Sequence, residues 1–154
     1  MTMTFEQFRA NVEAWATERG IYEHSTALAQ ALKAVSEVGE LADAVIKNDR
    51  TALIAAIGDV AVCLVNYAAL EGHQLKVIDV KGSDNQDSAE CAWTCVMMMA
   101  GIREDSRVCD YVLGCLDLIA RVNGLDFMVC CESAWLEIAP REGRMVAGGA
   151  FVKE

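Results

Sequence analysis

The sequence predicts an all-α fold, an antiparallel bundle of about five to six helices with a short irregular or hairpin C-terminal tail. Its 154 residues contain one proline, Pro140, so nothing upstream of that position forces a helix to break. Long stretches carry apolar residues at helical spacing, and short polar segments connect them, as between antiparallel neighbours. The length suits a single domain covering residues 1–154, which we expect to be completed by oligomerisation.

Two amphipathic helices are predicted in the first third of the chain. The first spans residues 4–19 and ends at Gly20. Ser25 or Thr26 can cap the second, which runs to about Lys47. The predicted apolar stripe of this second helix consists of Leu28, Leu32, Val35, Val38, Leu41 and Val45.

A third helix is predicted at residues 50–70, after a turn at Asn48 and Asp49 and before a stop at Gly72. It is apolar nearly all the way round, and such a helix is buried on most sides. In a domain of this size, we expect part of that burial to be against a second subunit.

The remaining elements are less regular. Residues 74–81 are expected to be partly extended, and residues 82–87 to form a loop. The small residues at 146–150 predict a turn or hairpin in the tail. Further helices are predicted at residues 88–100, 106–123 and 126–139.

The net charge of −10 limits the possible partners. It argues against binding to DNA or RNA, which needs clustered lysine and arginine, and it repels free nucleotides. A protein this acidic that handles phosphates needs a bound cation to reverse the local field. We find neither a secretory signal nor an uninterrupted apolar run of the ~20 residues that a membrane helix needs. We therefore expect a cytoplasmic protein that binds no membrane.

The seven cysteines are interpreted as reduced core residues. No Cys-x-x-Cys motif occurs, and the two histidines, His24 and His73, lie in no metal-ligand spacing. A zinc site is therefore the weaker interpretation.

Polar side chains form a stripe along the edge of the second predicted helix. Lys33, Glu37 and Glu40 follow one another at helical spacing, with Gln30 beside them. Gly39 lies inside this motif in the sequence, where it could allow another helix or a ligand to approach closely.

Two polar residues interrupt the apolar third helix. Asp59 and Asn66 lie on one of its faces, and a buried carboxylate without a partner is costly. If the second and third helices pack antiparallel, Asp59 faces Glu37 and Glu40. Three carboxylates meeting at one point require a cation, and oxygen ligands suit Mg²⁺ or Mn²⁺. The ordinary alternatives are a solvated Glu-x-x-Glu face, Asp59 paired with Lys33 or backbone donors, and Asn66 as a satisfied core amide.

At these positions the chain resembles the MazG-like group of the all-α nucleoside triphosphate pyrophosphatase superfamily. That family has a Glu-Glu-x-x-Glu helix followed by Glu-x-x-Asp, and the resembling stretches here are Lys33–Ala44 and Ile57–Val62. Short, often phage-encoded members have a C-terminal pattern similar to Gly124–Asp126, Cys131–Ile138, Arg141–Val146 and Phe151–Lys153.

The resemblance implies hydrolysis of a nucleoside triphosphate to the monophosphate and pyrophosphate with Mg²⁺, for which Mn²⁺ is a possible substitute. By position, Glu37, Glu40 and Asp59 match metal ligands, and Lys33 matches a basic residue that contacts phosphate; these four form the predicted catalytic set. The predicted substrate-binding residues are Lys33, Gln30, Asn66 and Arg144.

Two departures from the family pattern make the carboxylate set thinner. Ser36 stands where the first motif has its second glutamate, and Ala56 stands where the second motif has its glutamate. One Mg²⁺, completed by water and substrate oxygens, is therefore favoured over a two-metal site.

The tail adds a basic cluster, Arg141, Arg144 and Lys153. These side chains could reach phosphates in a neighbouring active site, or they could belong to a solvated tail. The family and the apolar third helix both favour a homodimer or homotetramer. The aromatic residues that could stack on a base, or serve as ordinary core, are Trp15, Tyr22, Trp93 and Trp135.

Other functions remain open. Loss of catalysis through Ser36 and Ala56 would leave a nucleotide-sequestering protein, and turnover gained by restoring glutamate at position 56 would support it. A structural helical adaptor predicts no effect of Mg²⁺ or nucleotide on thermal stability. Cysteine-based redox or metal chemistry predicts loss of function on alkylation of Cys91, Cys95, Cys130 or Cys131.

Overall fold

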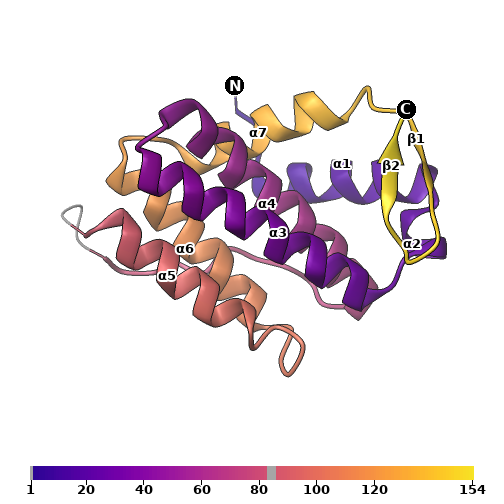
Figure 1. Cartoon of the computed structure of the whole chain (residues 1–154), viewed down its shortest axis with the longest axis horizontal. Helices are drawn as coiled ribbons and strands as arrows, with labels where there is room; N and C mark the ends of the chain where they lie inside the picture. The colour runs from indigo at the N-terminus through magenta and orange to yellow at the C-terminus, as the bar shows by residue number, and fades with distance from the viewer. Residues whose placement is uncertain (1, 83–85) are drawn as a thin grey trace.

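The computed structural model describes residues 2–82 and 86–154. Within them the regular secondary structure is helical apart from one small antiparallel sheet, so the predicted all-α fold is confirmed (Figure 1). The elements are α1 (Phe5–Glu18), α2 (Ile21–His24), α3 (Ala27–Lys47), α4 (Arg50–Glu71), α5 (Ser88–Met99), α6 (Val108–Val122), α7 (Phe127–Ile138), β1 (Gly143–Met145) and β2 (Phe151–Lys153).

The helix boundaries follow local capping signals. Thr26, Asp49 and Asp126 each accept a hydrogen bond from a backbone N–H in the first turn of the helix that follows. The prediction did not include the one-turn helix α2. Gly20 has a left-handed φ of 71°, which ends α1 but redirects the chain straight into this turn.

Helices α3 and α4 form an antiparallel pair joined by Asn48 and Asp49, as predicted. The face of α3 that meets α4 matches the predicted stripe only in its second half, where Val38 and Leu41 are buried. Its buried residues include Ala31, Ala34 and Ala44, whereas the leucine and valine side chains at its start are exposed, namely Leu28, Leu32 and Val35. Alanines let two helix backbones approach closely, which leaves the larger side chains on the opposite face.

Helix α4 is the centre of the hydrophobic core. It is long and apolar enough to cross a membrane, yet 72% of its most apolar stretch of residues is buried inside the domain. Helices α1, α3, α6 and α7 of the same chain pack around it. The same chain therefore provides most of the burial of this helix, and burial of a further part against a second subunit stays a prediction. Gly58 lies where α4 meets α7, and a side chain there would collide with the Cys130 carbonyl and Ala134.

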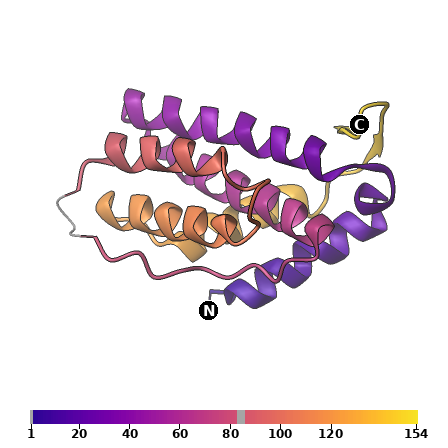
Figure 2. The ribbon, with the colours of Figure 1, turned by 90° about the horizontal axis from the view of Figure 1, so that it is seen from below.

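Helices α5 and α6 form the other side of the bundle. The segment at residues 73–82 crosses beneath them without regular structure, as Figure 2 shows. The buried carboxylate of Asp110 holds its beginning, accepting a hydrogen bond of 3.1 Å from the Lys76 backbone N–H and lying 2.9 Å from His73 Nε2. Residues 83–85 of the predicted loop lie outside the described residues.

The C-terminal hairpin lies beside the start of α3, near α1 and α2 (Figure 1). Its two strands pair Gly143 with Lys153, Arg144 with Val152, and Met145 with Phe151. A hydrogen bond of 2.6 Å from Ser25 Oγ to the Gly149 carbonyl fastens the turn to the N-terminus of α3. The predicted hairpin is thus present, and it is docked on the bundle.

Candidate functional site

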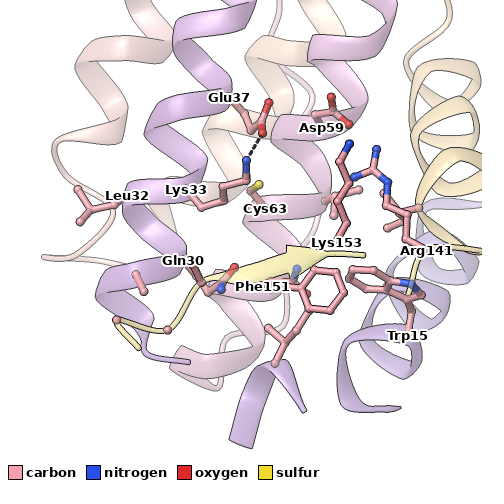
Figure 3. A pocket seen from close by; sticks show the side chains of 18 residues that line it. Trp15, Gln30, Leu32, Lys33, Glu37, Asp59, Cys63, Arg141, Phe151 and Lys153 are labelled. Carbon is pink, nitrogen blue, oxygen red and sulfur yellow. Dashed lines mark hydrogen bonds and ion pairs between the residues drawn. The ribbon is translucent and has the colours of Figure 1, made fainter. Parts of the chain in front are cut away.

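A cavity of about 750 Å³ lies between α3, α4, the end of α7 and the hairpin. Figure 3 shows β2 crossing it, with the charged groups gathered in one part of the view and the aromatic rings in another. Its charged and amide lining residues are Gln30, Lys33, Glu37, Asp59, Asn66, Arg141 and Lys153, and its aromatic ones are Trp15 and Phe151. All the predicted site residues except Glu40 and Arg144 line this cavity.

Helix α3 supplies Gln30, Lys33 and Glu37 from one edge. The Lys33 ammonium donates a hydrogen bond of 2.6 Å to Glu37 Oε1, one helical turn away. This bond and the charge of Glu37 outweigh burial and raise the pKa of Lys33. The Glu37 side chain is only 16% exposed, so water screens its negative charge weakly inside the cavity.

Helix α4 supplies Asp59 from the facing wall. Burial, together with the nearby charges of Glu37 and Glu137, raises the pKa of Asp59 from 3.8 to about 6, although Arg141 and Lys33 oppose the shift. Of the alternatives open from the sequence, a salt bridge between Asp59 and Lys33 is not formed, because Lys33 pairs with Glu37. The Asp59 carboxylate therefore lies in a site that favours an added positive charge.

The C-terminal segment brings two cations to the same place. Figure 3 shows the ends of the Arg141 and Lys153 side chains directed toward Asp59. Arg141 also forms an ion pair with Glu137. Its backbone is held from α1, since Arg19 Nε donates a hydrogen bond of 2.7 Å to the Arg141 carbonyl. The basic tail thus reaches the cavity of its own chain.

Arg144, predicted to bind substrate, is not among the residues that line the cavity. It pairs with Val152 across the hairpin, and cross-strand partners project from the same face of a sheet. Side chains alternate along a strand, so Phe151 and Lys153 project from the other face, into the cavity. The register of the hairpin therefore places Lys153, and not the predicted Arg144, in the cavity.

Two amides lie in the wall below the strand. Asn66 is 5% exposed, and its Oδ1 accepts a hydrogen bond of 2.8 Å from the Tyr22 hydroxyl. Gln30 is 6% exposed, and its Nε2 donates a hydrogen bond of 2.9 Å to Ser25 Oγ. Each amide thus uses one end to hold the local structure, while the residue lines the cavity. For Asn66, the expected roles of core amide and pocket residue are both compatible with this placement.

Glu40 lies in an adjoining cavity of about 450 Å³ between α3 and α4. This second cavity shares Lys33, Glu37 and Asp59 with the first. Ser36 and Ala56, the two departures from the family pattern, line it as well. Across residues 2–82 and 86–154, no three histidine, cysteine, aspartate or glutamate side chains are close enough together to form a metal-binding group. A side chain added at Gly39 of α3 would meet no other part of the chain within 4 Å of its Cβ.

The aromatic residues of the cavity came from opposite ends of the sequence. The rings of Trp15 and Phe151 meet edge to face, with centroids 5.5 Å apart. Trp15 was among the predicted candidates, whereas Phe151 was missed, because no local pattern shows where a tail docks. All seven cysteines are buried, as expected for small core residues, and Cys63 borders the cavity below Lys33 (Figure 3).

Comparison with known proteins bears on part of the chain. Residues 25–82 match the MazG nucleotide pyrophosphohydrolase domain, which confirms the resemblance over α3, α4 and the segment that follows. A 63-residue stretch is 38% identical to the uncharacterized 18.2 kDa protein in the rep-hol intergenic region of Haemophilus phage HP1 (strain HP1c1). The aligned stretch covers 41% of this chain and 39% of the phage protein. No solved structure matches the chain.

Proposed function

We propose that this chain, whose residues 25–82 match the MazG nucleotide pyrophosphohydrolase domain, hydrolyses a nucleoside triphosphate to the monophosphate and pyrophosphate. The observation that carries the proposal is the charge arrangement of one cavity. Glu37 and Asp59 face it from adjacent helices, and three cations line the same space, Lys33, Arg141 and Lys153. A triphosphate together with a divalent cation complements both signs of charge.

The carboxylates suit a hard divalent cation. We propose that Glu37, Glu40 and Asp59, which the structure does not gather into a metal-binding group, draw together around Mg²⁺, or Mn²⁺ in its place, with water and substrate oxygens completing the coordination. The raised pKa of Asp59 supports this proposal, because the site penalises an uncompensated negative charge. Bound there, the metal would neutralise the triphosphate and polarise its α-phosphorus.

We propose that the three cations bind the pyrophosphate leaving group. Lys33, Arg141 and Lys153 supply donors for the β- and γ-phosphates, whose negative charge increases as pyrophosphate departs. Arg141 is suited to bind two phosphate oxygens at once through its planar guanidinium group. The Trp15–Phe151 end of the cavity then remains for the nucleoside.

We further propose that the protein is a homodimer or homotetramer assembled through α3 and α5. These neighbouring helices expose large apolar side chains, among them Leu28, Leu32, Val35, Trp93 and Met97. Gly39 adds an open position on the same helix, where a helix of a second copy can approach closely. A cytoplasmic location, with no nucleic acid or membrane as partner, completes the proposal.

The first test is pyrophosphate release from a panel of ribo- and deoxynucleoside triphosphates with Mg²⁺ or Mn²⁺. We expect metal-dependent release of pyrophosphate and monophosphate in equal amounts. Glu40→Gln should lower kcat/KM at least about tenfold, since even groups that only support a metal ligand cost that much. Glu104→Gln, at an exposed position lining neither cavity, is the matched control.

The outcome also separates hydrolysis from sequestration. The thin carboxylate wall at Ser36 and Ala56 specifically favours the sequestering alternative. Tight nucleotide binding without release by the parent chain, with release gained in Ala56→Glu, would establish that alternative. Neither binding nor release by folded, metal-loaded protein would reject both.

A further inference from the structure

The C-terminal hairpin presents two chemically different side chains to the cavity. Phe151 and Lys153 are two residues apart on β2 and therefore project from the same face. Gly143 lies opposite Lys153 in the register, and a side chain there would collide with the Phe151 ring. The face of the hairpin that lines the cavity therefore carries an aromatic ring and a cation close together.

This placement is fixed by contacts with the rest of the chain. Ser25 joins the turn to α3 through its 2.6 Å hydrogen bond to the Gly149 carbonyl, and Gln30 supports Ser25. The Phe151 ring meets the Trp15 ring of α1 edge to face. The hairpin is therefore attached to two helices that it does not follow directly in sequence, and it lies outside the segment that matches the known family.

The cavity itself changes character from one end to the other. The charged side chains of Lys33, Arg141 and Lys153 lie with the two carboxylates toward one end, and the rings of Trp15 and Phe151 lie toward the other (Figure 3). Its volume of about 750 Å³ falls within the range of sites for drug-sized ligands. A nucleotide joins a flat ring to a polyanion and so matches both ends at once.

We propose that the hairpin is a nucleotide-recognition element of its own chain, in which Lys153 binds the terminal phosphates beside Arg141 and Phe151 contacts the base beside Trp15. This inference rests on the proposed function and adds residues from outside the catalytic helices. It assigns the base of the substrate to Phe151 and the terminal phosphates to Lys153, two residues apart on one strand.

The test measures binding rather than turnover. Titration calorimetry with Mg²⁺ compares a non-hydrolysable α,β-imido nucleoside triphosphate with inorganic tripolyphosphate, which has the charge but no base. Lys153→Gln should weaken both ligands about tenfold, as expected for loss of one phosphate contact. Phe151→Leu should weaken the nucleotide about tenfold, because an aromatic contact to the base is lost, and leave tripolyphosphate unchanged.

Two controls keep the result specific. Val152→Ala changes the outward face of the same strand, and Lys81→Gln removes an exposed charge that does not line the cavity. Both should bind as the parent does. Thermal melting of each variant confirms that the bundle stays folded.

The outcomes distinguish this inference from the proposed function. Parent-like affinity of both hairpin variants for the nucleotide would overturn the inference, even if the parent hydrolyses nucleotides. Equal weakening of nucleotide and tripolyphosphate by Phe151→Leu would overturn its assignment to the base. The expected pattern in a chain without turnover would uphold the hairpin's role and reject hydrolysis.

Discussion

Asp59 carries a carboxylate at a position that destabilises the folded chain. Its pKa is raised from 3.8 to about 6, and no hydrogen bond or ion pair to it is present in the described part of the chain. Between these pH values the folded protein binds more protons than the unfolded chain, so the penalty grows as the pH rises from about 4 to about 6. Above about pH 6 the full penalty is present.

Asp59→Asn should therefore stabilise the metal-free protein at neutral pH while removing activity. We expect a gain on the order of 1 kcal/mol after allowance for partial solvent screening, or roughly 3 °C in Tm. The gain should shrink toward about pH 5, where the carboxyl group of the parent becomes protonated. Thermal melts at both pH values, without metal, measure it.

Addition of Mg²⁺ provides the control for this substitution. The ion should raise the Tm of the parent chain and have a smaller effect on Asp59→Asn, because one proposed ligand is missing. A variant that melts below the parent at neutral pH without metal would contradict the unfavourable environment of this carboxylate.

At the scale of elements, the hairpin depends on one glycine for its docking. Gly149 has a φ of 83° and lies against Ser25 and Ala29, so a side chain there is strained and sterically blocked. The strands are only three residues long, and an isolated hairpin of this size has little stability of its own. Contact with α3 therefore determines whether the hairpin stays in place.

Gly149→Val should detach the hairpin and leave the helical bundle folded. We expect KM for the nucleotide to rise about tenfold or more, because Phe151 and Lys153 leave the cavity together, while the helical circular dichroism signal remains. Gly124→Ala is the control, since Gly124 also has a positive φ, 67°, but open space around it. An equal rise of KM in both variants would show a general effect of strain.

The whole molecule leaves an apolar surface on one side. Helices α3 and α5 expose Leu32, Val35, Trp93 and Met97, although the core beneath them is complete without a partner. We propose these two helix faces as the surface of assembly, because exposed apolar side chains on adjacent helices are typical of interaction sites. The acidic groove between α3 and α4 begins on the same helix, so assembly and chemistry share α3.

Trp93→Glu should convert the assembled protein to a monomer, because a buried charge would replace an aromatic contact in the interface. Sedimentation velocity at several concentrations measures this change. Leu136→Glu is the matched control, since Leu136 is 66% exposed on α7 and Trp93 is 61% exposed. A parent chain that remains monomeric at high concentration would reject the proposed oligomer.

What the sequence determined by itself is the set of long helices, without the one-turn helix α2, and the position of the acidic residues on two of them. Caps such as Thr26 and Asp49, and the helical period, depend on neighbours a few residues away, so they can be read locally. For the same reason, the placement of Glu37 and Asp59 on consecutive antiparallel helices was predictable.

Only the tertiary structure decided which faces meet. Leu28 and Leu32 were assigned to the core but are exposed, because the alanines of α3 pack more closely on α4. Arg144 was assigned to the substrate, but the register of the hairpin turns it outward and turns Lys153 inward. The choice of a buried face and the pairing of distant strands depend on contacts between segments far apart in the chain, and no local pattern encodes them.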